Sequence, residues 1–199
     1  MNHDSEVAPP SGKGALVLDE ESVIQPYNSL RPVPTALTTE ARASNAQLLN
    51  QILADSMVLF TLYKKHHWFM RGHTFYQLHL LFDRHAEEQL ALIDKMAERV
   101  QSLGAVAISD PWHVAEVAKL ERPPRGVEEV TAMLSRLVQA HVLLMEESRE
   151  AIATTATNMD WTTNDLLVGD VLRINEKQVW ILAEHLMNGG PDFEGFRSG

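Results

Sequence analysis

Two pairs of side chains that can bind metal ions lie within residues 66–104, each pair separated by one helical turn. His79 is followed four residues later by Asp83, and Asp94 is followed four residues later by Glu98. On a helix, side chains at this spacing project from the same face. Imidazole and carboxylate ligands together suit first-row divalent metals such as Fe²⁺. The solvated face of an acidic helix would carry the same residues, so spacing alone leaves both interpretations open.

Apolar residues at helical spacing predict the elements that must position these pairs. Long helices are expected over residues 38–70, 74–103, 127–155 and 162–187, and the buried side of the second is expected to include Phe75 and Leu90. Residues 105–126 form a long connection with a short predicted helix over 112–120, and such a crossover can join opposite ends of a bundle. No strand pattern competes. We therefore expect an all-α fold, a four-helix bundle of ferritin-like architecture with a long crossover between its second and third helices.

The composition and net charge of the 199-residue chain limit its domain organisation, its chemistry and its cellular location. Residues 1–37 hold five of the nine prolines and are expected to be an extended or mobile tail, followed by the bundle over 38–188 and a carboxyl-terminal tail over 189–199. The absence of cysteine excludes disulfides and thiolate chemistry. No signal peptide or membrane span is visible, so a cytoplasmic protein is expected. The net charge of −10 suits a protein that attracts cations.

The axial distance between the two pairs constrains how they could bind an ion. Asp83 and Asp94 are roughly 16 Å apart along one straight helix, and metal–ligand bonds of about 2 Å cannot bridge that gap. Two copies of the helix, antiparallel about a two-fold axis near residues 88–89, would place His79 and Asp83 of one chain opposite Asp94 and Glu98 of the other. This pairing would form two equivalent sites between subunits. His67, on the inward side of the preceding helix, could add a ligand.

A longer motif surrounds these residues, reading His67-Trp68-x-x-x-Gly72-x-x-Phe75-x-x-Leu78-His79-x-x-x-Asp83, then Asp94-x-x-x-Glu98-Arg99 and Leu103-Gly104. This motif resembles the signature of the Dps family of mini-ferritins, and the similarity covers residues 38–188. The bundles of true ferritins carry Glu-x-x-His instead. No glutamate of this chain has a histidine three residues later, so an intra-subunit di-iron centre is not expected.

The resemblance implies a ligand set and an activity. His67, His79 and Asp83 of one chain, with Asp94 and Glu98 of its neighbour, would form a ferroxidase centre in a hollow dodecamer built from two-fold dimers. The implied enzyme is a ferroxidase that oxidises Fe²⁺, with hydrogen peroxide as the favoured oxidant, and stores ferric iron in the cavity. It would protect a bacterial cytoplasm against oxidative stress, with zinc as a competing ion.

The alternative class is a DNA-binding protein that protects the nucleoid, with iron chemistry secondary. Some members of the family bind DNA through lysine-rich tails. Here residues 1–37 carry a net charge of −3, and residues 190–199 have one arginine against two acidic residues. Neither segment has the positive charge that neutralising phosphates requires. We therefore expect no DNA binding through the tails.

Further residues receive secondary assignments. Trp68, next to His67, is expected to shield the site, with filling of a subunit interface as an equal alternative. The resemblance implies that Asp160 and Asp165 line a three-fold pore that admits iron, with loop solvation and helix capping as the alternatives. Thr162 and Asp165 are predicted to form a capping box for the last helix. The other histidines are interpreted as loose or surface residues (His66, His73, His85) or as a hydrogen-bonded core residue (His141).

Overall fold

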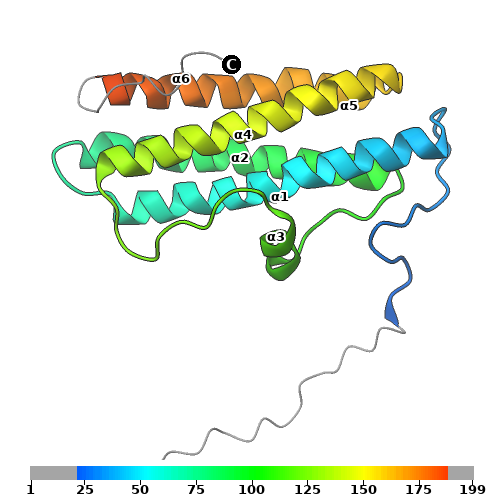
Figure 1. Cartoon of the computed structure of the whole chain (residues 1–199), viewed down its shortest axis with the longest axis horizontal. Helices are drawn as coiled ribbons and strands as arrows, with labels where there is room; N and C mark the ends of the chain where they lie inside the picture. The colour runs from blue at the N-terminus through cyan, green and yellow to red at the C-terminus, as the bar shows by residue number, and fades with distance from the viewer. Residues whose placement is uncertain (1–21, 188–199) are drawn as a thin grey trace, which may run out of the picture.

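The computed structural model describes residues 22–187, which form a bundle of long helices and one short helix in the crossover (Figure 1). The elements are α1 (Thr39–Phe69), α2 (Phe75–Ser102), α3 (Pro111–Val117), α4 (Val130–Thr157), α5 (Trp161–Asp165), the π-helical segment η2 (Leu166–Leu172) and α6 (Arg173–Met187). The last three run without a break and together form the fourth helix of the bundle. The predicted all-α, ferritin-like architecture with its long crossover is confirmed.

Local chemistry defines the ends of these helices. The Thr38 hydroxyl accepts a hydrogen bond from the Ala41 amide at the start of α1. Gly72, at a φ of +88°, makes the turn between α1 and α2 where the sequence predicted a break. The sequence predicted the wrong capping residue for the fourth helix. Asp160, not Thr162, caps α5, and its side chain accepts from the Thr163 amide.

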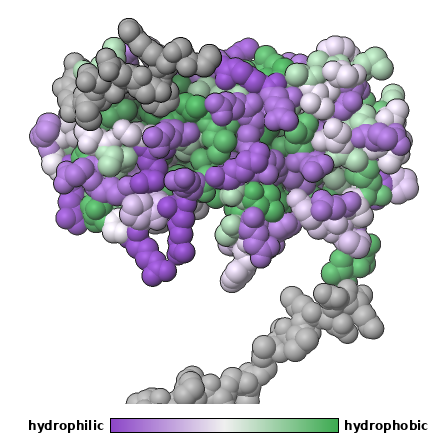
Figure 2. Space-filling model, viewed as in Figure 1, coloured by the Kyte–Doolittle hydropathy of each residue, from purple (hydrophilic) through white to green (hydrophobic). Residues whose placement is uncertain are grey.

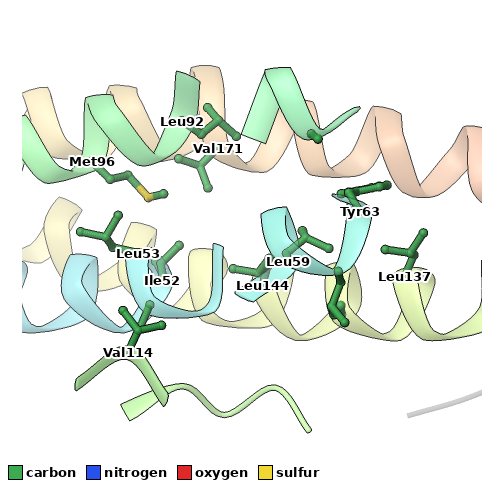
Figure 3. Close-up of a cluster of buried hydrophobic side chains, with 14 of the residues drawn as sticks. Ile52, Leu53, Leu59, Tyr63, Leu92, Met96, Val114, Leu137, Leu144 and Val171 are labelled. Atoms are coloured by element: carbon green, nitrogen blue, oxygen red, sulfur yellow. The ribbon is translucent and has the colours of Figure 1, made fainter. Parts of the chain in front are cut away.

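The core lies where α1 faces α2 and α4, and where α4 faces α6 (Figure 3). Its fully buried side chains include Ile52, Leu53, Leu59, Leu92, Met96, Leu137 and Leu144. Burying each such side chain contributes roughly 1.5–3 kcal/mol, and this holds the helices together more than their intrinsic propensity does.

Two buried polar side chains of α1 fix the crossover. The Asp55 carboxylate accepts hydrogen bonds from the backbone amides of Lys119 and Leu120, just after α3. The Asn50 side chain donates to the Val106 carbonyl and accepts from the Ile108 amide. These hydrogen bonds give partners to backbone groups of residues 106, 108, 119 and 120, which lie outside the helices.

Part of the segment expected to be a tail contacts the bundle. The Arg31 amide donates to the Gly104 carbonyl at 2.8 Å, and the Arg42 guanidinium donates to the carbonyls of Arg31 and Leu103. The Tyr27 ring packs edge-on against His113 of α3. Residues 1–21 of the predicted N-terminal tail and the whole predicted carboxyl-terminal tail, 189–199, lie outside the described residues, as does residue 188 at the end of the predicted bundle.

The visible face in Figure 2 is largely hydrophilic, with hydrophobic patches between the polar side chains. Within residues 22–187, no helix combines the length and the apolar character needed to cross a membrane.

Candidate metal centre

His67, near the end of α1, and His79, near the start of α2, meet across the turn at Gly72. Their rings stack with centroids 3.7 Å apart and planes 17° from parallel. Nδ1 of His67 lies 2.8 Å from the carbonyl oxygen of His79, and Nδ1 of His79 lies 3.0 Å from that of His67. Because a carbonyl oxygen only accepts, both Nδ1 atoms carry the proton. Both Nε2 atoms therefore keep a lone pair for a metal ion, with ring orientation fixed by the backbone.

Asp83 lies one turn after His79 and is half-buried. The Lys64 ammonium donates to its Oδ1 at 2.5 Å. This hydrogen bond, reinforced by the charge of Lys64 and opposed by burial, lowers the pKa of the Asp83 carboxyl. The carboxylate is consequently ionised at neutral pH and can bind a cation. The structure thus brings His67, His79 and Asp83 into one neighbourhood.

Asp94 and Glu98 lie on the same helix but remain apart from this cluster. Both side chains are exposed on α2. Among the described residues of one chain, no group of three or more histidine, aspartate or glutamate side chains is close enough to hold a metal ion. That these two groups of residues are parts of one site, completed by a second chain, stays a prediction.

Exposed apolar side chains share the face of α2 that carries these parts. At 100° per residue, Tyr76, Leu80 and Leu90 fall within the arc that holds His79 and Glu98. Their side chains are 66%, 49% and 53% exposed. The sequence pattern assigned Leu90 and Phe75 to the core, and this was wrong, since Phe75 is 42% exposed and stacks on His79. A helix face with several uncovered large apolar groups is typical of a protein–protein interface.

Trp68 follows His67 and is 67% exposed. In the isolated chain its indole ring is open to solvent, so its shielding role stays a prediction that depends on a second subunit.

The remaining histidines divide between core and surface differently from the prediction. His66 and His85 are fully buried, so their interpretation as loose or surface residues was wrong, whereas His73 is exposed. His141 is a buried, hydrogen-bonded residue as predicted, bonded to Tyr63 and Asn175. Burial lowers the pKa of His141 to about 4 and is the largest influence lowering that of His85 to about 3.

Asp160 and Asp165 occupy contrasting environments. Asp160 is 3% exposed, and its carboxylate accepts hydrogen bonds from Arg99, Thr163 and Asn45. Asp165 is exposed at the end of α5. Of the two residues assigned to a pore, only Asp165 presents its carboxylate to solvent.

Comparison with known proteins agrees with this architecture. The family described as the ferritin-like domain matches residues 46–189, most of the chain. The chain is therefore a ferritin-like protein.

Two solved structures and two curated relatives narrow the class. DpsC from Streptomyces coelicolor is 55% identical with a TM-score of 0.83, over 85% of this chain and 99% of that one. Dps from Thermosynechococcus elongatus is 29% identical with a TM-score of 0.71, over 80% and 98%. A Kitasatospora aureofaciens protein described only as uncharacterized is 51% identical over 67% of this chain and 89% of its own. DNA protection during starvation protein 2 of Bacillus anthracis is 27% identical over 70% and 94%. The chain belongs to the Dps family.

Proposed function

We propose that this protein is a mini-ferritin that oxidises Fe²⁺ at sites shared between two subunits and stores the ferric product in a hollow dodecamer. The observation that carries the proposal is the pair of stacked histidines with both Nε2 lone pairs free of the backbone, one turn from an ionised carboxylate. Imidazole and carboxylate ligands together suit Fe²⁺, and hard carboxylate oxygens favour the ferric product.

The second part of the site would come from a neighbouring chain. An antiparallel pairing of two α2 helices places Asp94 and Glu98 of one chain opposite His79 and Asp83 of the other. The same pairing covers Tyr76, Leu80 and Leu90, which are exposed in the single chain. Hydrophobic burial would therefore drive the association that completes the metal ligands.

Hydrogen peroxide is the proposed oxidant. It accepts two electrons and yields two hydroxide ions, so two Fe²⁺ ions supply the electrons without releasing a free radical. Zinc, which accepts the same nitrogen and oxygen ligands, would compete for the site. Asp165 is the residue proposed to line the path that admits iron, because its carboxylate is open to solvent.

A second candidate function is DNA protection. The Bacillus anthracis relative carries that function in its name, and a Synechococcus relative, 27% identical, is named a nutrient stress-induced DNA-binding protein. The net charge of this chain, −10, and the acidic balance of residues 1–37 count against binding through the tails. A gel shift at physiological salt that shows tight, salt-sensitive complexes would establish DNA binding.

The test of the proposal is peroxide-driven iron oxidation. The purified assembly is loaded with Fe²⁺ under anaerobic conditions, hydrogen peroxide is added, and ferric absorbance is followed. The double variant Asp94→Ala/Glu98→Ala should lose at least about tenfold in rate, since even outer-shell changes at metal sites cost 10–100-fold. The matched control Glu116→Ala/Glu121→Ala removes two exposed carboxylates from the crossover and should keep the rate. Equal rates in the two variants would refute the proposed site.

A further inference from the structure

Tyr63 lies in the middle of the core with its hydroxyl group bonded to two histidines. The side chain is fully buried and comes from α1, one turn after Leu59 (Figure 3). Its oxygen is 2.5 Å from Nε2 of His141 on α4 and 3.1 Å from Nδ1 of His85 on α2. Metal ligation by His67, His79 and Asp83 does not use any of these three residues.

The hydrogen bonds around His141 determine where its proton lies. The Asn175 amide nitrogen donates to the Val171 carbonyl at 2.7 Å, so the Asn175 oxygen faces His141 as an acceptor. Nδ1 of His141 is 2.7 Å from that oxygen and must donate to it. Nε2 of His141 therefore has a lone pair and accepts the Tyr63 hydroxyl proton. Nδ1 of His85 then donates to the same phenol oxygen.

The π-helical segment contributes to this arrangement. Val171 lies within η2, and Asn175 follows in the first turn of α6. Gln89 of α2 also donates to the Asn175 oxygen, at 3.2 Å. The amide of Asn175 is thus held from two helices, and its orientation fixes His141 as a proton acceptor. Short π segments inside helices are often found at functional positions.

The protonation states of Tyr63 and His141 at neutral pH agree with a hydrogen bond that Tyr63 donates to His141. Burial raises the pKa of Tyr63 well above its ordinary value, with the charge of Glu88 adding to the effect. Burial likewise lowers the pKa of His141 to about 4. At neutral pH the phenol keeps its proton and the imidazole is neutral. Proton transfer between them requires that an electron leave the phenol, because oxidised phenols are strong acids.

We propose that Tyr63 is a one-electron relay for the ferroxidase centre, with His141 as the acceptor of its proton. His67 lies four residues after Tyr63 on α1, so the two side chains are separated by about one helical turn, 6 Å along the axis. Phe82, which precedes the ligand Asp83, has its ring centroid 6.0 Å from that of Tyr63. The relay rests on the proposed function, because it needs an oxidant at the iron site.

The relay acts when only one Fe²⁺ occupies a site. Hydrogen peroxide takes one electron from that ion and the second from Tyr63, and its O–O bond breaks to give two hydroxide ions. The Tyr63 hydroxyl proton passes to Nε2 of His141, leaving a neutral tyrosyl radical and an imidazolium. A second Fe²⁺ later returns an electron, and the proton goes back to the phenol oxygen. The sum is two Fe²⁺ oxidised by one peroxide, with no hydroxyl radical released.

The relay is tested by freeze-quench electron paramagnetic resonance on the full-length assembly. Fe²⁺ is loaded at or below one ion per shared site, and hydrogen peroxide is added. A neutral phenoxyl signal should form in the natural protein and be lost in Tyr63→Phe. The control Tyr27→Phe should retain it. Because the chain has three tyrosines, the double variant Tyr27→Phe/Tyr76→Phe leaves Tyr63 as the only source and should also retain the signal.

The outcomes separate the relay from the proposed function. Ferric absorbance without a phenoxyl signal, a signal that survives Tyr63→Phe, or an indole-type signal would overturn the relay and leave the ferroxidase proposal intact. If Tyr63→Phe does not fold, absence of the signal from Tyr27→Phe/Tyr76→Phe overturns the relay by itself. If no ferric absorbance develops in the natural protein, both proposals are wrong.

Discussion

The imidazole rings of His67 and His79 stack at 3.7 Å, and each ring bonds through Nδ1 to the backbone carbonyl of the other residue. Two residues from different helices thereby fix each other's tautomer. Because both bonds end on the backbone, no additional side chain is needed to orient the two rings. The turn at Gly72 brings the two helix ends close enough for this exchange.

Lys64 modulates the third residue of this cluster. Its ammonium pairs with Asp83 at 2.5 Å and must be displaced or accommodated when a cation binds. An ion pair as exposed as this one contributes up to about 1 kcal/mol, so Lys64→Met should tighten Fe²⁺ binding by up to about fivefold. Anaerobic titration calorimetry measures the change. The control Lys177→Met removes an ammonium paired with Glu88 and should leave the affinity unchanged. Weaker binding in Lys64→Met would contradict competition by Lys64.

Alanine substitutions at Gly104 and Gly72 can test how closely residue 31 packs against the end of α2. Both have positive φ, +86° and +88°. An added Cβ at Gly104 would lie 2.6 Å from the Arg31 carbonyl oxygen, whereas at Gly72 it meets no described atom within 4 Å. Alanine at either position costs about 1–2 kcal/mol in backbone strain, and Gly104→Ala should cost more because of the clash. Thermal unfolding of the two variants compares them, and equal losses would show that residue 31 does not constrain position 104.

Stability should depend on the protonation of the buried histidines. Burial is the largest influence that lowers the pKa of His66 to about 4, while an unfolded histidine titrates near 6.5. Between these values the unfolded chain binds a proton that the folded chain excludes, so stability falls as the pH falls through this window. His85 and His141 act in the same direction.

His66 can be replaced without breaking a hydrogen bond to any described residue, since neither ring nitrogen has a partner among them. In His66→Leu the free energy of unfolding should depend less on pH across the window, by up to about 1.4 kcal/mol per pH unit. Unfolding curves at several pH values between 4 and 6.5 provide the slopes. Parallel slopes in the two proteins would mean that His66 titrates normally in the folded chain.

Asp160 should matter for stability, and Asp165 should not. Burial alone would raise the pKa of Asp160, but hydrogen bonds from Thr163 and Asn45 and the charge of Arg99 outweigh it and lower the pKa. Removing one partner of a buried ion pair costs about 3 kcal/mol or more, which sets the expectation for Asp160→Ala. Asp165→Ala, at an exposed position, should change stability by less than about 0.5 kcal/mol. Chemical denaturation distinguishes them, and a stable Asp160→Ala would contradict the structural role.

The helices were predictable because apolar residues recur at helical spacing and glycine marks their ends. His79, Asp83, Asp94 and Glu98 were predicted as ligands because they lie on one arc of a single helix and because the surrounding motif resembles the Dps signature, and this assignment stays a prediction. Their separation along the axis means that they could bind one ion together only across two chains. The mutual bonding of His67 and His79 and the pairing of Lys64 with Asp83 depend on tertiary structure and were not predicted.

Other features were hidden from the sequence for physical reasons. Leu90 and Phe75 are apolar and helical in spacing, but a single-chain pattern does not distinguish a core face from an interface. His85, Gln89 and Asn175 are polar residues that are buried with hydrogen-bond partners on other helices, since Gln89 of α2 donates to Asn175 of α6 and His85 of α2 is bonded to Tyr63 of α1. The i,i+4 spacing of His85 and Gln89 between the buried Phe82 and Met96 was the one available signal.

Subunit mixing tests most directly whether the proposed metal centre is shared between subunits. One variant carries His79→Ala/Asp83→Ala and the other Asp94→Ala/Glu98→Ala, and each alone should be inactive in peroxide-driven iron oxidation. In a mixed dimer, the unsubstituted residues of the two chains meet at one of the two sites, and the substituted residues meet at the other. Random co-assembly should therefore restore about a quarter of the natural rate. If the mixture stays as inactive as its components, the centre is not shared between subunits.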